Sequence, residues 1–378
     1  MNKIENLIDR ICPNGVQYKP ITDVATIKRG VRVVKVQLAN QGEIPVYQNS
    51  VTPMGYYSVS NCPANTPFII GAGAAGEIGY SFVDFWAADD CFFFVCSKTL
   101  DSRYLYHALL CQQRFLLSKV RKASIPRLSR TIIEKLIIPV PPLPVQQEIV
   151  RILDSFTQLT AELTAELTAR RKQYEYYRSN LLTQCNAPYV ELRQVVQKSC
   201  SGATPAKGRS EYYENGTIPW LRTQDVRFNQ ITEATSYITE KAVAETAAKW
   251  IPENCVIVAI SGASAGRCAI NKLRATTNQH CLNLEIDPKK ALYKFVFYCV
   301  ASEYEELLSK KQGARGDLNS SLILSLKIPL PSIEEQTRIV SILDRFDALC
   351  NDLTSGLPAE IEARRKQYEY YRGKLLTF

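Results

Sequence analysis

Two long stretches of the chain carry apolar residues at intervals of three and four, which is the spacing of a coiled-coil seam. The first helix is expected to begin after a proline-rich segment, around Val145, and to run to about Thr183. Its seam consists of Ile149, Ile152, Phe156, Leu159, Leu163, Leu167, Tyr174, Tyr177 and Leu181. The second helix is expected to begin around Glu334. Its seam consists of Ile342, Phe346, Leu349, Leu353, Leu357, Ile361, Tyr368, Tyr371 and Leu375.

The first stretch is too long to be stable without burying its apolar stripe. About 39 residues at 1.5 Å each make the first helix roughly 58 Å long, and such a helix must bury its apolar stripe. The second helix is the expected partner, in an antiparallel coiled coil.

An internal duplication organises the chain. Residues 169–178 and 363–372 both read ARRKQYEYYR, and each copy is followed two residues later by Leu-Leu-Thr. Further back, residues 138–154 match residues 328–344 in Ile-Pro-x-Pro and in Ile-Val-x-Ile-Leu-Asp. Weaker matches pair Ile44-Pro45 with Ile218-Pro219, Ala75-Gly76 with Ala265-Gly266, and Cys91 with Cys281.

The duplication predicts an α+β protein in the order globule, helix, globule, helix. The expected segments are a globular α/β domain at 1–145, a helix at 146–184, a second globular domain at 185–334 and a helix at 335–378. Because one helix leaves the first globule and the other returns from the second, the pair closes a pseudo-twofold, circular arrangement.

The first helix contains a short repeat of its own. Residues 160–163 read Thr-Ala-Glu-Leu, and residues 164–167 repeat them. One four-residue unit lengthens a helix by about 6 Å and turns its far end by about 40°. We interpret the repeat as a spacer that sets the separation of the globules. A solvated helix segment with good helix propensity is the alternative.

Composition permits a polyanionic partner and favours an intracellular protein. The formal net charge is +9, which suits phosphate neutralisation but is also typical of an ordinary solvated surface. The 12 cysteines form no C-x-x-C pair, and the first ten residues lack the apolar core of a signal peptide. No apolar run is long enough to span a bilayer. We therefore expect a cytoplasmic protein without a membrane partner.

Basic residues gather in loops that contain no acidic residue. Residues 102–133 contain seven basic side chains and no acidic one, and residues 192–210 repeat this pattern. Arg, Gln and Asn match the hydrogen-bonding edges of guanine and adenine, and such residues follow both Ile-Pro dipeptides. Ordinary polar loops are the alternative. The candidate DNA contacts are Lys28, Arg29, Arg32, Lys35, Gln48, Asn49, Arg121, Lys122, Arg127, Lys198, Thr204, Lys207, Arg209, Arg222, Thr223, Gln224 and Arg315.

Three catalytic or cofactor patterns are considered and rejected. Residues 71–76 fit the G-x-G-x-x-G motif, but a dinucleotide loop must open a helix, whereas residues 80–96 are strand-like. A tight turn is predicted there and at residues 261–266. His107 and His280 lack companion cysteines at zinc-ligand spacing, so no metal site is predicted. A nucleophilic dyad that uses Cys281 is not favoured.

The repeated motifs resemble the specificity subunits of type I restriction-modification systems over essentially the whole chain. The resemblance rests on Ile-Pro-(Val/Leu)-Pro leading into Gln147 or Gln336, on Ile-Val-x-Ile-Leu-Asp, and on the helix end ARRKQYEYYR. Gly202-Ala203-Thr204-Pro205, followed by Ile218-Pro219-Trp220, resembles the opening of a target recognition domain. The first globule departs from this pattern with Arg29-Gly30-Val31-Arg32.

The resemblance implies two target recognition domains that read the halves of an interrupted double-stranded DNA site. It implies a non-catalytic chain without a bound cofactor, which recruits two methyltransferase subunits that use S-adenosylmethionine and restriction/translocase subunits that use ATP. A coiled-coil scaffold without DNA readout is the alternative. The candidate partner contacts are Arg170, Arg171, Tyr174, Tyr177, Arg178, Arg364, Arg365, Tyr368, Tyr371 and Arg372.

Overall fold

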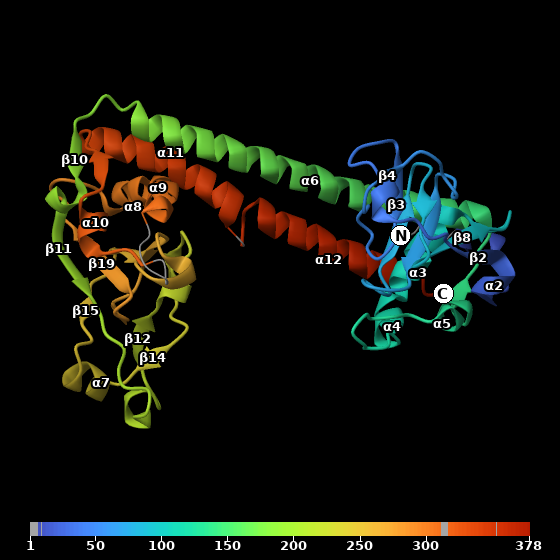
Figure 1. Cartoon of the computed structure of the whole chain (residues 1–378), viewed down its shortest axis with the longest axis horizontal. Coiled ribbons are helices and arrows are strands. Elements are labelled where there is room, and N and C mark those ends of the chain that lie inside the picture. Colours follow the sequence, from blue (N-terminus) through green and yellow to red (C-terminus); the bar gives the residue numbers. More distant parts are fainter. Residues whose placement is uncertain (1–6, 9, 311–316, 353) are drawn as a thin grey trace. The chain divides into compact units, whose positions relative to one another are not determined.

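The chain folds into two compact units that each combine a globular part with two helix segments. The computed structural model describes residues 7–8, 10–310, 317–352 and 354–378. Unit 1 comprises Met1–Ala165 and Ala359–Phe378, and unit 2 comprises Glu166–Pro358. The helix α6 (Leu143–Thr183) is continuous and contributes its first part to unit 1 and the rest to unit 2 (Figure 1).

Unit 1 contains three small sheets with the strand orders β2-β8-β5-β6, β4-β3-β7 and β1-β9. Its strands are β1 (Tyr18–Pro20), β2 (Ala25–Arg29), β3 (Ile44–Tyr47), β4 (Tyr56–Tyr57), β5 (Thr66–Ile70), β6 (Ile78–Ser81), β7 (Trp86–Ala87), β8 (Cys91–Cys96) and β9 (Ile137–Pro139). Its shorter helices are α2 (Ile21–Val24), η1 (Lys35–Gln37), α3 (Ser102–Cys111), α4 (Gln113–Ser118) and α5 (Arg130–Glu134). The continuous apolar run of β5 is buried on both faces, as its composition predicts.

Unit 2 contains sheets with the strand orders β11-β19-β16-β17-β13, β14-β12-β18-β15 and β10-β20. Its strands are β10 (Tyr189–Glu191), β11 (Val196–Ser201), β12 (Ile218–Leu221), β13 (Gln230–Ile231), β14 (Tyr237–Ile238), β15 (Trp250–Ile251), β16 (Val256–Ala259), β17 (Cys268–Asn271), β18 (Ala275–Thr277), β19 (Cys281–Ile286) and β20 (Lys327–Pro329). Its helices other than α6 are η2 (Leu192–Gln194), η3 (Ser210–Tyr212), η4 (Thr223–Asp225), α7 (Glu240–Glu245), η5 (Gly262–Ser264), α8 (Tyr293–Ser302), α9 (Tyr304–Ser309), α10 (Ser320–Leu324) and α11 (Ile333–Asn351).

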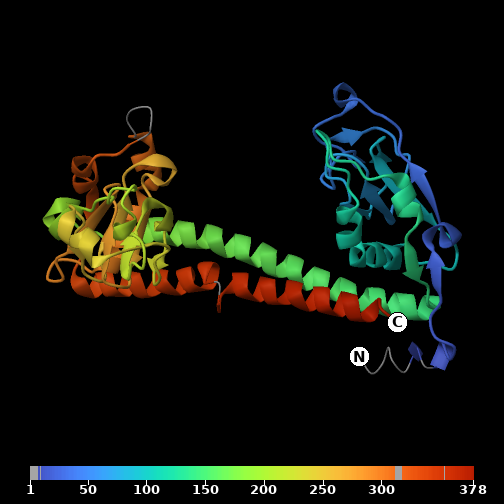
Figure 2. The ribbon, with the colours of Figure 1, turned by 90° about the horizontal axis from the view of Figure 1, so that it is seen from below.

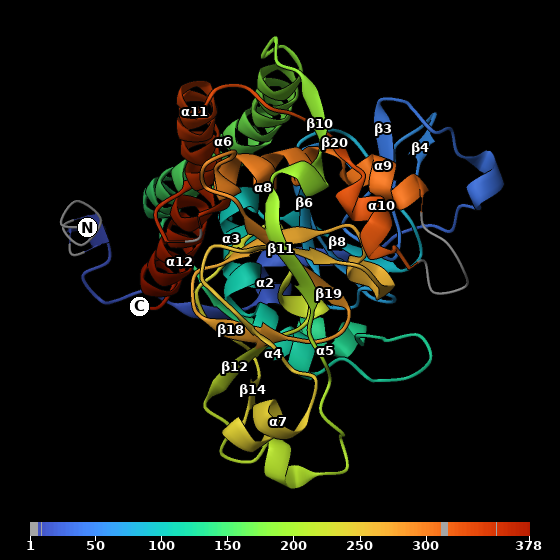
Figure 3. The same cartoon turned by 90° about the vertical axis from the view of Figure 1, so that its left-hand side faces the viewer.

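The two units share one topology, which confirms the predicted duplication and the α+β class. The antiparallel set β2, β8, β5 and β6 of unit 1 corresponds to β11, β19, β16 and β17 of unit 2. Likewise, β3 pairs antiparallel with β4 and parallel with β7, as β12 does with β14 and β18. In unit 2, α8 lies against the sheet of β19, and the segment with β12, β14 and α7 extends from it (Figure 3).

In each unit, part of α6 packs against a segment of the C-terminal helical region. In unit 1, Phe156 stacks on Tyr371 of α12 (Leu357–Leu375), with 5.3 Å between ring centroids. In unit 2, Tyr177 stacks on Phe346 of α11, with 5.5 Å between centroids. Both pairs run antiparallel (Figure 2), so the predicted antiparallel packing is confirmed within each unit, whereas Leu159 and Leu349 of the predicted seam are exposed. Within the described ranges, no helix is both long enough and apolar enough to cross a membrane.

The prediction of one continuous helix at 335–378 is wrong, because the helix is interrupted between Asn351 and Leu357. The Asp352 carboxylate accepts hydrogen bonds from the backbone N–H of Thr354 at 2.7 Å and from the Ser355 hydroxyl at 2.5 Å. Such local side-chain bonds compete with helix formation, and the Gly and Pro residues at 356 and 358 add to the break. Leu353 of the predicted seam lies outside the described residues.

A buried glutamine joins the start of each long helix to the globular part of its unit. Gln146 accepts a hydrogen bond from Asp101 N–H at 2.8 Å and donates to the carbonyls of Thr99 at 2.9 Å and Pro141 at 2.7 Å. Gln336 makes the matching bonds in unit 2 to Leu292 N–H and to the carbonyls of Lys290 and Pro331. The motif glutamine of the first copy is therefore Gln146, and the assignment to the exposed Gln147 is wrong.

The aspartate of each Ile-Val-x-Ile-Leu-Asp motif forms a second junction between helix and globule. In unit 1, Asp154 binds Arg103 at 2.9 Å and His107 at 2.9 Å, and His107 also contacts the Tyr368 hydroxyl at 3.1 Å. In unit 2, Asp344 accepts bonds from Lys294 and Tyr298 of α8. Burial lowers the pKa of His107, against the opposing effect of the Asp154 carboxylate. A neutral imidazole therefore bridges the two helices of unit 1.

Candidate nucleic-acid interface

Unit 1 contains a hollow of about 520 Å³ that is lined by basic side chains. Arg29 enters it from the end of β2, and Arg121 and Arg127 enter it from the loop between α4 and α5. The other charged residues that line it are Lys119, Arg130, Asp89 and Asp90. Basic side chains thus outnumber acidic ones by five to two, and a concave surface of one dominant sign concentrates the field that attracts an anionic ligand.

The basic loop of the hollow is held by backbone hydrogen bonds to the glycine-rich turn at 71–76. Leu128 N–H donates to Gly71 O at 2.8 Å, and Gly73 N–H donates to Pro126 O at 3.1 Å. Gly73 has a φ of 85°, which favours glycine. The turn connects β5 to β6, so the prediction of a tight turn is confirmed and the dinucleotide-loop alternative is wrong. The same holds for residues 261–266, which connect β16 to β17.

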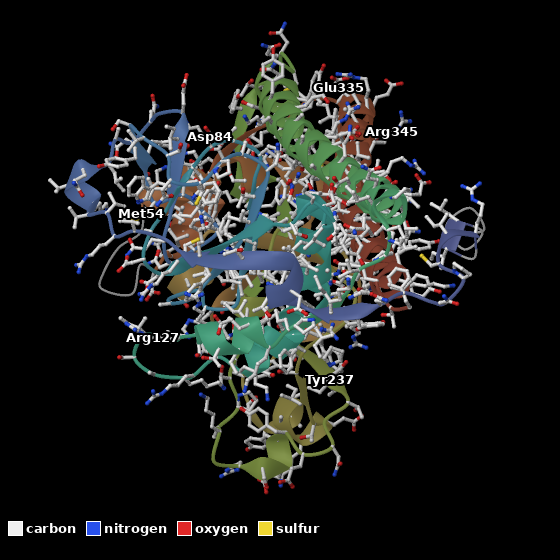
Figure 4. All side chains as sticks on the ribbon, turned by 90° about the vertical axis from the view of Figure 1, so that its right-hand side faces the viewer. Met54, Asp84, Arg127, Tyr237, Glu335 and Arg345 are labelled. Carbon is white, nitrogen blue, oxygen red and sulfur yellow. The ribbon has the colours of Figure 1, made fainter. Side chains whose placement is uncertain are left out.

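Several predicted DNA contacts of unit 1 come together around this turn. The side chains of Arg29, Arg121 and Arg127 line the hollow, and Asn49 is adjacent because its carbonyl accepts the Ala74 N–H at 2.9 Å. Arg127 lies on the exposed loop at the side of the globular part (Figure 4). Gln48 precedes Asn49 directly. The other candidates of unit 1 are exposed without lining the hollow, namely Lys28, Arg32, Lys35 and Lys122.

Unit 2 places Thr204 and residues 222–224 near the turn that precedes β19. The Thr204 hydroxyl donates to Gln279 Oε1 of this turn at 2.5 Å. Arg222 is half-buried, with its guanidinium carbon 5.6 Å from the ring centroid of Trp220. Thr223 and Gln224 belong to the short helix η4 that follows. This part of unit 2 therefore combines an arginine with amide and hydroxyl groups.

The remaining candidates of unit 2 are less directly connected with that surface. Lys198 lies opposite Glu285 in the pairing of β11 with β19. Arg209 forms ion pairs with Glu211 at 3.7 Å and Glu245 at 3.8 Å, so its charge is offset within the unit. Lys207 is exposed. Arg315 lies outside the described residues.

The structure divides the predicted partner contacts into residues that pack inside each unit and residues that face outward. Burial raises the pKa of Tyr174 and of Tyr368 to about 12. Tyr177 and Tyr371 stack on phenylalanines of the paired helix. The remaining arginines have neighbours on their own helices: Arg178 lies over Tyr174 and Arg372 over Tyr368, while Arg170 pairs with Glu166 and Arg364 with Glu360.

The outward side of the repeated decapeptide is the same in both copies. Tyr176 is 63% exposed and Tyr370 is 61% exposed. We call this surface the repeated outer face, and it consists of Arg171, Lys172, Glu175 and Tyr176 in unit 2 and Arg365, Lys366, Glu369 and Tyr370 in unit 1. Arg171 and Arg365 are among the predicted partner contacts. The exposed tyrosines Tyr176 and Tyr370 are not, because the prediction selects the seam tyrosines of each copy instead.

Other polar residues of the interface were not predicted. Lys119 and Arg130 lie in the acid-free stretch but were not selected. Asp89 and Asp90, and their counterparts Gln279 and His280, directly precede the matched Cys91 and Cys281. That match was visible in the sequence and could have identified them. Among the described residues, no group of three His, Cys, Asp or Glu side chains is arranged to hold a metal ion.

A family model for the type I restriction modification DNA specificity domain matches residues 13–170 and again residues 187–363. The chain is 42% identical over 258 residues to the type I restriction enzyme EcoR124I/EcoR124II specificity subunit of Escherichia coli, a match that spans 65% of this chain and 63% of that protein. It is 32% identical over 387 residues, with 96% of each chain covered, to a Haemophilus influenzae protein named provisionally as a type I restriction enzyme specificity subunit.

Two solved structures with similar folds come from type I restriction-modification systems. The crystal structure of a type I restriction-modification S subunit from M. genitalium has a TM-score of 0.65 at 16% identity and covers 96% of both chains. A chain from a study of complex assembly and conformational transition of the type I R-M system has a TM-score of 0.61 at 16% identity, covering 96% of this chain and 98% of that one. At this identity, the likeness supports the fold alone.

Proposed function

This chain belongs to the type I restriction-modification DNA specificity family, and we propose that its two units read the two halves of an interrupted double-stranded DNA site. The observation that carries the proposal is the hollow of unit 1, where basic side chains from β2 and from one loop converge. Lysine and arginine hold the phosphate backbone, while neighbouring polar tips discriminate bases in the groove. Unit 2 offers the same backbone arrangement with other polar tips, which suits a different half-site.

The basic loop provides the test of DNA binding. Replacing Arg121 and Arg127 together with glutamine is expected to weaken DNA binding by at least about tenfold near physiological salt. The slope of log affinity against log salt is negative, and each lost phosphate contact makes it less steep by about 0.9, so the double change makes it less steep by about 2. Fluorescence anisotropy with a labelled duplex, at several salt concentrations and with the methyltransferase partner present, measures both quantities.

Lys98→Gln is the matched control, because Lys98 is exposed just beyond the opposite end of β8 from the hollow. It removes one positive charge from unit 1, where the double variant removes two, and it should leave the affinity and the salt slope unchanged. Equal losses in the control and in the double variant would contradict a specific role for the hollow. Absence of DNA binding by the unmodified chain with its partner would favour the coiled-coil scaffold instead.

The repeated outer face is our proposed docking surface for two copies of one methyltransferase partner. Exposed positions elsewhere in the duplication have diverged, as Arg151 against Ser341 and Ser155 against Arg345 illustrate. Buried positions of the same helix starts have stayed identical, as Ile149 against Ile339 and Leu153 against Leu343 illustrate. Surface residues without contacts tolerate substitution, so ten unchanged residues that include an exposed side imply a common external ligand. Tyrosine and arginine are frequent anchors of protein interfaces.

The rest of the assembly follows from the proposed role. We expect the chain to select the site without performing chemistry and without a cofactor of its own. S-adenosylmethionine is then expected on the methyltransferase subunits, and ATP on the restriction/translocase subunits. Because the ligand is the DNA of the cell, we propose that the complex acts in the cytoplasm.

A further inference from the structure

One turn occupies the same place in the two units but carries different polar side chains. We call it the reading turn, and it consists of Asp89 and Asp90 before β8 in unit 1 and of Gln279 and His280 before β19 in unit 2. In unit 1 the preceding residue, Ala88, donates its N–H to the last residue of β3 at 2.8 Å. In unit 2, Asn278 donates its N–H to the last residue of β12 at 3.0 Å.

A second pair of backbone bonds fixes the loop that faces the reading turn. Val31 N–H donates to Ala87 O at 2.9 Å in unit 1, and Ala203 N–H donates to Thr277 O at 3.0 Å in unit 2. The glycine before each donor approaches the strand so closely that a Cβ on Gly202 would lie 1.8 Å from a carbonyl oxygen. The two scaffolds are therefore alike, and the difference between the units lies in the side chains.

The reading turn of unit 1 places carboxylates inside a mainly basic hollow. Arg29 Nε donates to the main-chain carbonyl of Asp89 at 2.6 Å rather than to its carboxylate. One carboxylate oxygen of Asp89 is buried without a hydrogen-bond partner, and neither Asp89 nor Asp90 forms an ion pair within the described part of the chain. A hollow that bound phosphate alone would gain nothing from two carboxylates. Their free acceptor capacity instead suits a hydrogen-bond donor on a ligand that the arginines hold.

The reading turn of unit 2 presents an amide that is oriented by its neighbours. Gln279 is exposed, its oxygen accepts the Thr204 hydroxyl at 2.5 Å, and its nitrogen lies 3.2 Å from His280 Nε2. The oxygen retains one lone pair and the nitrogen retains one hydrogen. An amide that keeps one acceptor and one donor can bind N6 and N7 of adenine together.

We propose that the reading turn determines base preference: Asp89 and Asp90 accept a hydrogen bond from the N4 amino group of a cytosine, and Gln279 binds an adenine in the other half-site. This inference rests on the proposed function, since it assigns bases within the same interface. The pairing follows the general donor and acceptor pattern of the major groove, where carboxylates recognise cytosine and glutamine recognises adenine.

Selection of bound duplexes from a random pool tests the inference. The full chain with its methyltransferase partner is compared with the variants Asp89→Asn/Asp90→Asn and Gln279→Glu, which keep the shape of each side chain. The aspartate variant is expected to lose cytosine preference at one position of one half-site by about tenfold to hundredfold. The affinity of the aspartate variant for random DNA is expected to rise, because the substitutions remove two negative charges from a mainly basic hollow. The glutamine variant is expected to lose adenine preference in the other half-site only.

Asp23→Asn is the control, since Asp23 is exposed on α2 at the opposite end of β2. It should leave both half-sites unchanged. If both variants select the same two half-sites as the unmodified chain, the inference is overturned while the proposed function stands. Selection of no sequence by the unmodified chain would overturn both.

Discussion

Replacing Tyr176 and Tyr370 together with alanine is expected to leave a folded chain that binds the two proposed methyltransferase partners much more weakly. Both side chains are more than half exposed, so their removal costs the fold little. An aromatic anchor at an interface contributes about 2 kcal/mol, which weakens each docking event roughly 30-fold. Each single variant should retain one partner at full affinity, because the two copies lie in different units.

Native mass spectrometry of the mixture measures how many partners each variant binds, and isothermal titration measures their affinity. Tyr189→Ala is the matched control, since Tyr189 is 54% exposed in unit 2 but lies outside the repeated decapeptide. A single variant that binds two partners with unchanged affinity would contradict the docking surface. Loss of both partners in either single variant would contradict independent sites.

Replacing Gln146 with leucine is expected to destabilise unit 1 by about 3 kcal/mol. The change deprives one N–H and two carbonyls of their partner, and each buried polar group without a hydrogen bond costs about 1 to 3 kcal/mol. Gln336→Leu should destabilise unit 2 to a similar extent, because the same three bonds are lost there. Urea unfolding of the full chain, followed by circular dichroism, measures the losses.

The neighbouring Gln147 supplies a precise control. It has the same chemistry but is exposed, so Gln147→Leu should change the free energy of unfolding by no more than about 0.5 kcal/mol. Equal effects at positions 146 and 147 would show that the buried hydrogen bonds do not join the helix to the globule. A stable Gln146→Leu variant would lead to the same conclusion.

The architecture could be predicted largely because the chain repeats itself. Identical motifs at a constant offset mark the two globules and the two helix starts, and the three-four spacing predicts the packing between Phe156 and Tyr371. The break after Asn351 could not be predicted from the apolar spacing, because the apolar residues on both sides of the break keep the helical interval. The break is caused by a local hydrogen bond that the Asp352 carboxylate accepts from the backbone. That the two helix pairs form one continuous antiparallel coiled coil stays a prediction.

The site could be predicted only as a set of basic loops. Runs of basic residues in the sequence identify Arg121 and Arg127. The sequence does not show which basic residues meet in the hollow, because that depends on the backbone hydrogen bonds between their loop and the turn at 71–76. Spacing alone likewise placed Tyr174 and Tyr177 at an interface. The spacing could not distinguish packing between helices inside the unit from binding of an external partner. Tyr176 is the tyrosine that is exposed for such a partner.

Mapping of methylated bases in the DNA of cells that carry this chain with its methyltransferase and restriction partners tests the central claim most directly. The account predicts one modified motif with two defined blocks, of different sequence, separated by a fixed number of unspecified bases. A single uninterrupted motif, or methylation that is independent of this chain, would contradict it.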